Sequence, residues 1–324
     1  MNGVDFIHSR AAGAYIGLAV GDALGATVEF MTPREIRAHF GVHDRVRGGG
    51  WLNLKRGSVT DDTTMSLALG QAILDAGCID ALACAQAFDA WMRAKPVDIG
   101  NTVRRGLVHF RATGETSAPP REDDAGNGAC MRCLPVALAT FGRPAQQVRA
   151  AALTQAHVTH NNPLSDAATE LLVLMVQRAL AGGGMTDLLG ECVGPLVAAH
   201  PEFRFRTRRA ENPSGYVVET IRAVLQALFD TDTFESCLID VVNRGGDADT
   251  TGAIAGMVAG AVYGRAAIPS YWVDVVDTAI TQACEQQARA LIGLSRSPPR
   301  AECGEAGADS APRRARPVAG RQAV

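Results

Sequence analysis

Two short segments, far apart in the sequence, combine carboxylates with threonines just ahead of an apolar helical pattern. Residues 60–63 read Thr-Asp-Asp-Thr, and residues 247–251 read Asp-Ala-Asp-Thr-Thr. Either segment alone is explained by helix capping, because Asp and Thr are favoured at N-caps and acids suit the positive end of a helix dipole. Capping needs only one acceptor, whereas these segments hold four carboxylates. The candidate cation ligands are Thr60, Asp61, Asp62, Asp247, Asp249 and Thr250.

The chemistry of this residue set favours hard divalent cations. If the two helix starts meet, their like charges repel unless a cation lies between them. Oxygen ligands suit Mg²⁺, Mn²⁺ or Ca²⁺, whereas zinc and copper prefer His or Cys. A carboxylate that bridges two ions holds them ~3.5–4 Å apart in two-metal hydrolases. We therefore expect a two-metal hydrolase site; the rival, an EF-hand calcium loop, lacks its acid at the twelfth position.

Further polar residues lie between the expected helices, and each alone is more typical of a cap or a turn than of a site. Residues 126–128 (Gly-Asn-Gly) open a helical pattern, where free backbone amides can bind phosphate oxygens. Cys130 and Cys133 form a C-x-x-C without a second Cys or His pair, so we interpret them as buried thiols in a helix. The other candidate positions are Glu29, Asp98, Asn101, Gly126, Asn127, Gly128, His160 and Tyr216.

The elements that must position these residues are helices. Apolar residues recur at helical spacing, and no alternating strand pattern persists. Gly13, Gly17, Gly21 and Gly25 are four apart, which predicts a central helix closely approached by another. We expect one all-α domain over residues 1–294, with long loops at 32–56 and 113–127 and a disordered tail at 295–324. Helices are expected at 11–25, 63–76, 80–94, 102–112, 128–141, 145–156, 163–181, 187–199, 216–229, 234–242, 250–262 and 271–294.

Charge and composition exclude some classes of function. The net charge of the 324-residue chain is −3, and residues 1–295 carry 25 basic against 31 acidic side chains. A mildly acidic protein gives no support to nucleic-acid binding, which would need a basic face. We see no signal peptide and no transmembrane segment, and we expect a cytoplasmic protein.

Four motifs resemble the ADP-ribosylglycohydrolase family. They are residues 17–25 (Gly-Leu-Ala-Val-Gly-Asp-Ala-Leu-Gly), 60–63, 126–129 and 245–252, in the family's order. The resemblance runs from about residue 10 to residue 294. Segments 26–31, 48–52, 96–101 and 231–234 are similar to family members of nitrogen-fixing bacteria.

This resemblance implies an all-α fold with a binuclear Mn²⁺ or Mg²⁺ centre in a cleft. It gives the metal ligands as Thr60, Asp61, Asp62, Asp247, Asp249 and Thr250. It makes Asp98 and Glu29 the acids that move protons. It places Asn101, Gly126, Asn127, Gly128, His160 and Tyr216 around the bound ADP-ribose. Where the resembling sequences continue a His-Asn pair with a second His, this chain has Asn162.

The resemblance also implies a reaction and partners. The reaction is removal of ADP-ribose from an arginine of dinitrogenase reductase, the nitrogenase iron protein. The partners are that protein, and a PII signalling protein with an ammonium channel, through which the enzyme would associate reversibly with the membrane. Two alternatives stay open: hydrolysis of another linkage, such as serine-ADP-ribose or O-acetyl-ADP-ribose, and a non-catalytic binding or structural role. The four carboxylates favour catalysis over the latter.

Overall fold

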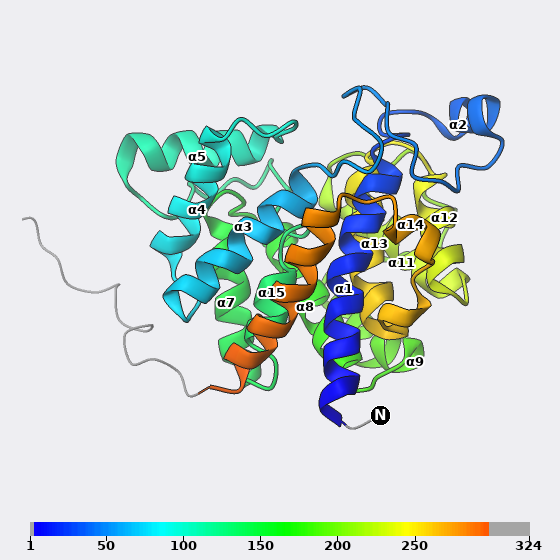
Figure 1. Ribbon diagram of the computed structural model, residues 1–324. Coiled ribbons are helices and arrows are strands. Elements are labelled where there is room, and N and C mark those ends of the chain that lie inside the picture. The colour runs from blue at the N-terminus through cyan, green and yellow to red at the C-terminus, as the bar shows by residue number, and fades with distance from the viewer. Residues whose placement is uncertain (1–2, 298–324) are drawn as a thin grey trace, which may run out of the picture.

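The computed structural model describes residues 3–297 of the chain, and over these residues the protein is helical (Figure 1). Two isolated β-bridges, Gly49–Leu54 and Gly126–Tyr216, are the only extended pairings there. The expected all-α class is confirmed. Residues 298–324 of the tail expected to be disordered lie outside the described residues. Within residues 3–297, no helix is long and apolar enough to cross a bilayer.

The helices and their bounds follow in chain order. They are α1 (Gly3–Gly25), α2 (Pro33–Phe40), α3 (Asp61–Ala76), α4 (Ala81–Arg93), α5 (Asn101–Thr113), α6 (Leu134–Ala139), α7 (Ala145–His157), α8 (Pro163–Leu180), α9 (Met185–Asp187), the π-helix η1 (Leu188–Val193), α10 (Gly194–Ala199), the 3₁₀ turn η2 (Pro201–Phe203), α11 (Val217–Asp230), α12 (Phe234–Val242), α13 (Ala248–Tyr263), the 3₁₀ turn η3 (Arg265–Ala267), α14 (Ser270–Val273) and α15 (Thr278–Ser295).

The centre of the fold is the antiparallel pair α1 and α13, which Figure 1 shows side by side. A Cβ built on Gly17 would lie 2.1 Å from the carbonyl oxygen of Gly256, and one on Gly21 would lie 2.0 Å from that of Gly252. Backbones this close leave no room for a side chain. Each interior glycine costs a helix about 1 kcal/mol against alanine, and the close packing of α1 on α13 offsets that cost.

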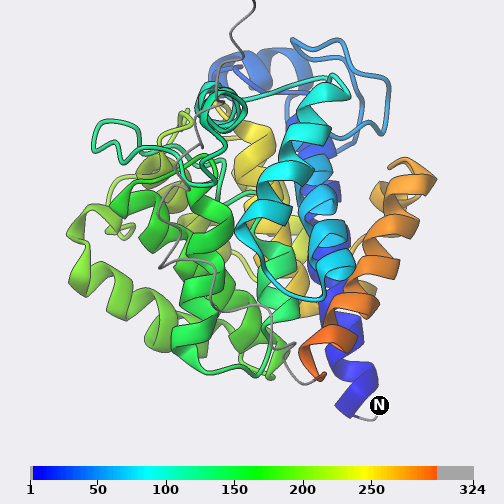
Figure 2. The ribbon, with the colours of Figure 1, turned by 90° about the vertical axis from the view of Figure 1, so that its left-hand side faces the viewer.

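The remaining helices cover this pair and carry the polar segments to one end of it. In Figure 2, α3 (cyan) and α15 (orange) lie along the flank of α1. Because α1 and α13 run antiparallel, the C-terminal end of α1 meets the N-terminal end of α13, where Gly25 packs on Ala248. The start of α3 reaches the same end through contacts to Asp22 of α1.

Four expected elements differ in the structure. The expected helix 187–199 contains the π-helix η1 between α9 and α10, and the expected helix 271–294 is broken between α14 and α15. The expected loop 32–56 contains helix α2, which has a complete capping box between Thr32 and Glu35. The expected helix 128–141 is reduced to α6, and residues 128–132 form turns, so Cys130 and Cys133 precede a helix instead of lying within one. The physical reason is that the amide of Asn127 is tied to the Gly215 carbonyl, which directs the chain across the site. Both thiols are buried and free, as expected.

Candidate active site

The start of α3 is capped by another helix. Asp22, buried in α1, accepts hydrogen bonds from the backbone amides of Thr60 (2.9 Å) and Thr63 (3.1 Å). It also accepts the hydroxyls of Thr60 (3.0 Å) and Thr63 (2.5 Å). Thr60 occupies the N-cap position but its side chain makes no capping bond. The carboxylates of Asp61 and Asp62 are therefore not needed to cap α3.

The start of α13 is held differently. Asp247 sits at its N-cap position without a capping bond, and its carboxylate accepts the Asn127 side-chain amide at 2.6 Å. The same amide donates to the Thr220 hydroxyl at 2.9 Å, which fixes its orientation. Asp249 accepts the backbone amide of Thr250 at 2.9 Å. This start is braced by the turn at Asn127.

The two helix starts meet, which is the condition that the hypothesis of a shared cation site sets. The Thr250 hydroxyl lies 3.3 Å from Asp62 Oδ2, and the Thr60 hydroxyl lies 3.2 Å from the same oxygen. The Thr60 hydroxyl is also 3.5 Å from Asp249 Oδ2. Ligand candidates from both segments are thus interleaved and buried.

Glu29 and Asp98 extend this cluster. Glu29 follows α1 and accepts the indole N–H of Trp51 at 2.5 Å. Asp98 precedes α5 and its carboxylate accepts the amide of Ile99 at 2.7 Å. One carboxylate oxygen from each of Glu29, Asp98 and Asp249 lies within 4.8 Å of the others, a spacing that one cation can bridge. The two acids predicted to move protons therefore lie directly beside the predicted metal ligands.

The electrostatics of the cluster follow from burial and crowding. Burial raises the pKa of Glu29 to about 8, with Asp247 and Asp98 adding repulsion against the Trp51 hydrogen bond that lowers it. Burial, then the charges of Asp98 and Asp22, raise the pKa of Asp61 to about 8. Burial and neighbouring carboxylates also raise the pKa values of Asp62, Asp247 and Asp249. Without a cation, several of these groups hold protons at neutral pH.

The residues fit a hard divalent cation. Asp62 Oδ1 is buried and has no hydrogen-bond partner among the described residues. An unpaired buried acceptor is costly, and in a carboxylate its natural partner is a cation. The surrounding ligand atoms are all carboxylate and hydroxyl oxygens, which are the atoms that Mg²⁺ and Mn²⁺ prefer as ligands. The cluster can hold a metal, and its oxygen ligands favour a hard divalent cation.

A cavity of about 300 Å³ opens onto the cluster. Acids of the cluster, the Gly126–Gly128 turn and His160 all line it, and the Asn127 side chain joins the turn to the acids through its hydrogen bond to Asp247. Among the predicted site residues, Thr60 and Asp62 lie buried behind the wall, and Tyr216 stands outside the cavity with 42% of its surface exposed. Its backbone pairs with Gly126. The predicted residues that line the cavity are Glu29, Asp61, Asp98, Asn101, Gly126, Asn127, Gly128, His160, Asp247, Asp249 and Thr250.

His160 is oriented by a buried hydrogen-bond chain. Arg132 donates to the Thr159 hydroxyl at 2.8 Å, and that hydroxyl lies 2.7 Å from His160 Nδ1. The Thr159 hydroxyl can donate its hydrogen to Nδ1, and in that tautomer the ring proton lies on Nε2. Burial, and then the charge of Arg132, lowers the pKa of His160 well below its usual value, so the ring is neutral. In the tautomer with the proton on Nε2, His160 presents an N–H donor beside the Gly126–Gly128 turn.

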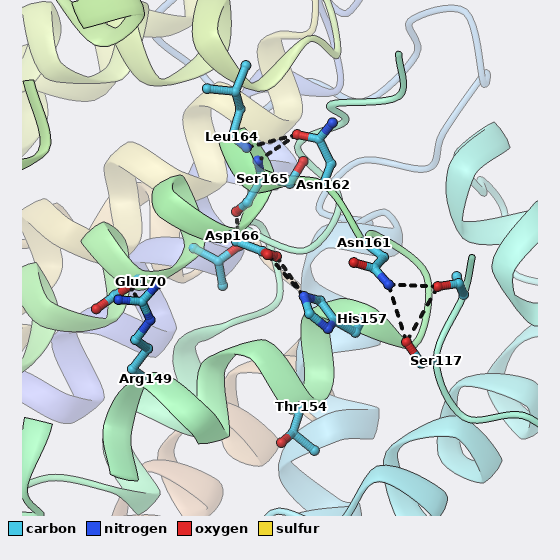
Figure 3. Close-up of polar contacts among 12 residues, drawn as sticks. Ser117, Arg149, Thr154, His157, Asn161, Asn162, Leu164, Ser165, Asp166 and Glu170 are labelled. Carbon is cyan, nitrogen blue, oxygen red and sulfur yellow. Dashed lines mark hydrogen bonds and ion pairs between the residues drawn. The ribbon is translucent and has the colours of Figure 1, made fainter. Parts of the chain in front are cut away.

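Asn162 has a structural role at the start of α8. Figure 3 shows its side-chain oxygen accepting the amides of Leu164 (2.8 Å) and Ser165 (3.3 Å), which caps α8. Its side-chain nitrogen donates to the carbonyls of Arg121 and Glu122, bracing the loop at 113–127. Asn162 is the N-cap residue of α8, ahead of Pro163. Asn162 does not line the cavity.

Comparisons with known proteins identify the family. The family model described as ADP-ribosylglycohydrolase matches residues 4–300. This chain belongs to the ADP-ribosylglycohydrolase family. A solved structure described as an ADP-ribosylglycohydrolase-related protein complex has a TM-score of 0.80 and 35% identity, covering 90% of this chain and 99% of that one.

Two curated relatives refine the placement within the family. The chain is 50% identical over 289 residues to ADP-ribosyl-[dinitrogen reductase] glycohydrolase of Rhodospirillum rubrum, covering 89% of this chain and 97% of that protein. It is 34% identical to ADP-ribosylarginine hydrolase Tri1 of Serratia proteamaculans, covering 82% and 74%. The resemblance seen in the four motifs is confirmed over nearly the whole described chain.

Sequence reasoning missed several residues that build the site. Asp22 was visible as an isolated acid in an otherwise apolar, glycine-rich helix, which is a signal for a buried polar partner. Arg132 and Thr159 carried no such signal, because their roles depend on a contact between α5, α7 and the turn before α6. Phe30, which lines the cavity beside Glu29, could not be distinguished from a core aromatic.

Proposed function

We propose that this protein is a divalent-cation-dependent hydrolase that removes ADP-ribose from an arginine side chain of dinitrogenase reductase and so restores its activity. The observation that carries the proposal is the convergence of carboxylates from α3, α13 and the end of α1 in one cavity, in a chain half identical to the Rhodospirillum rubrum enzyme. The name of the Serratia proteamaculans relative, an ADP-ribosylarginine hydrolase, supports arginine as the linkage.

In this proposal the acidic end of the cavity holds the ribose that is joined to arginine. Two cations, Mn²⁺ or Mg²⁺, would be held by Thr60, Asp61, Asp62, Asp247, Asp249 and Thr250. Once bound, they would lower the pKa of a water and polarise the ribose hydroxyls. Asn101, Asn127 and the amides of Gly126 and Gly128 hold the diphosphate, and Tyr216 contributes from the rim.

The protein groups then move protons. Water attacks the anomeric carbon, and the carbon–nitrogen bond breaks with its electron pair passing to the guanidine nitrogen. Asp98 takes the proton from the attacking water. Glu29, which is held by Trp51 at 2.5 Å, delivers a proton to the departing guanidine. The products are free ADP-ribose and an unmodified arginine.

The wider setting is part of the proposal. Residues 1–294 form the catalytic domain. The enzyme works in the cytoplasm and is captured reversibly at the membrane by a PII signalling protein and an ammonium channel. This setting follows the resemblance of this chain's motifs to family members of nitrogen-fixing bacteria.

One experiment separates the proposal from its alternatives. Arginine-ADP-ribosylated dinitrogenase reductase is incubated with the enzyme, with Mn²⁺ or with EDTA, beside an Asp249→Ala variant. We expect ADP-ribose release only from the wild type with Mn²⁺. Release without a cation, or undiminished release by the variant, contradicts the metal-dependent mechanism. Release from a serine-linked substrate alone would favour the other linkage, and no release from either would favour a binding protein.

A further inference from the structure

The segment that covers the active-site end of α1 differs in charge from the rest of the protein. Residues 32–56 hold six basic and two acidic side chains, a net of +4. The rest of residues 1–295 holds 19 basic and 29 acidic side chains, a net of −10. Figure 1 shows this segment, with α2, as a projecting feature beside the end of α1.

The cations of this segment are exposed and unneutralised. All six are solvent-exposed, and none forms an ion pair with another described residue. Elsewhere on the surface, Arg105, Arg111 and Arg178 are paired with acids. The six are Arg34, Arg37, Arg45, Arg47, Lys55 and Arg56.

Large apolar side chains accompany the cations. Trp51 and Val42 are 54% and 59% exposed. Phe30, just before the segment, is 62% exposed and lies 5.2 Å from Trp51 between ring centroids. Phe30 has a φ of +61°, a conformation uncommon for an aromatic residue. Its amide donates to the Gly246 carbonyl at 2.7 Å, so the exposed ring is held in place.

The segment is fixed to the body of the protein, so its charges are preorganised. Asn243 of the α12–α13 turn exchanges two hydrogen bonds with the backbone of His43, at 2.9 and 2.8 Å. The indole of Trp272 donates to the Asp44 carbonyl at 2.9 Å. The indole of Trp51 donates to Glu29 inside the active site. The segment therefore forms a rigid rim that is continuous with the acidic end of the cavity.

We propose that residues 30–56 form the docking surface for an acidic face of the ADP-ribosylated protein around its modified arginine. The inference rests on the proposed function. Exposed aromatic and arginine side chains beside a cavity are typical of protein-recognition surfaces. The positive segment steers an acidic partner to this side of an otherwise acidic molecule. The rim would thus select a protein-linked substrate over a small one.

The test compares a protein substrate with a small one. The variant Arg34→Gln/Arg37→Gln removes two exposed charges from α2, away from the catalytic residues. The matched control Arg289→Gln/Arg296→Gln removes two exposed and unpaired charges from the far end of α15. We expect kcat/KM for ADP-ribosylated dinitrogenase reductase to fall about threefold to tenfold in the α2 variant, through KM. For ADP-ribosyl-arginine, kcat/KM of the α2 variant stays within about twofold of the wild-type value. The loss on the protein substrate shrinks in 0.5 M salt.

Three results would overturn the docking surface. The first is an equal loss of activity on both substrates by the α2 variant, which would mean that the segment attracts ADP-ribose itself. The second is an unchanged kcat/KM of the α2 variant on the protein substrate. The third is a loss in the α15 control as large as in the α2 variant, which would mean that net charge alone acts. Failure of the proposed function is distinct from all three, because the wild type would then release no ADP-ribose from either substrate.

Discussion

The starts of α3 and α13 share a sequence pattern but are built in different ways. At α3, Asp22 from α1 takes all the capping bonds and leaves Asp61 and Asp62 without a capping role. At α13, Asp247 itself occupies the cap position and is held by Asn127 from a turn. Another helix therefore supplies the capping acceptor at α3, whereas at α13 the side chain at the cap position makes no capping bond and is held by a turn. This difference predicts how each start fails.

The largest effect is expected where both starts are positioned together, at the contact of α1 with α13. Gly21→Ala places a Cβ 2.0 Å from the Gly252 carbonyl oxygen. To relieve this clash, the backbones of α1 and α13 would have to move apart. We expect a loss of more than about 4 kcal/mol in the free energy of unfolding, measured by urea denaturation. Gly293→Ala on α15, where no atom lies within 4 Å, is the control and is expected to be neutral or slightly stabilising.

The next effect distinguishes the two starts. Asp22→Asn replaces an acceptor of four hydrogen bonds with a group that also presents N–H to donors, so we expect about 2–4 kcal/mol of destabilisation. Asn127→Ala removes the hydrogen bonds to Asp247 and Thr220 and is expected to cost about 1–2 kcal/mol. Urea denaturation of both variants without metal makes the comparison. Equal costs would show that the two starts are built alike.

The pH dependence of the metal-free protein sharpens the account of the cluster. The pKa values of Asp61 and Glu29 rise to about 8 in the folded state, against about 4 in the unfolded chain. The folded state thus binds more protons between these values, and this contribution to stability is lost as the pH rises from 4 to 8. In EDTA we expect Tm to be roughly 5 °C lower at pH 8.5 than at pH 6. Excess Mn²⁺ should remove most of this difference. A Tm in EDTA that rises from pH 6 to pH 8.5 would contradict raised pKa values of Asp61 and Glu29 in the folded state.

A smaller effect is expected at His160, beside the Gly126–Gly128 turn. Thr159→Val keeps the shape of the side chain but breaks the chain from Arg132 to His160. We expect about tenfold weaker binding of ADP-ribose, measured by calorimetry, and a change of the His160 tautomer in ¹⁵N NMR spectra. Thr159→Ser keeps the hydroxyl and should restore both. Loss of affinity with an unchanged tautomer would mean that Thr159 acts only by packing.

The comparison also shows which parts of the structure the sequence could predict. Glycines four residues apart predicted that another helix closely approaches α1, because residues at that spacing lie near one helix face. The two acidic segments predicted their own meeting, because four carboxylates exceed what caps require. The Thr32–Glu35 capping box of α2 was readable from the sequence, but the glycines and charges around it indicated a loop.

Other parts depended on contacts that no local pattern records. Asp22 caps a helix 38 residues further along the chain, and Thr159 acts on His160 only because Arg132 reaches it from the turn before α6. The shortened α6 has the same origin, since the Asn127 amide is committed to Gly215. Tertiary hydrogen bonds decided these features against local preference.

The measurement that tests the central claim most directly is calorimetric titration of the metal-free protein with Mn²⁺. The wild type, Asp61→Asn from the α3 start and Asp249→Asn from the α13 start are compared. If the two starts form one centre, the wild type binds two ions per chain, and each variant loses at least tenfold in affinity while keeping its helical content. Wild-type affinity in either variant, or no binding by the wild type, would contradict a shared site.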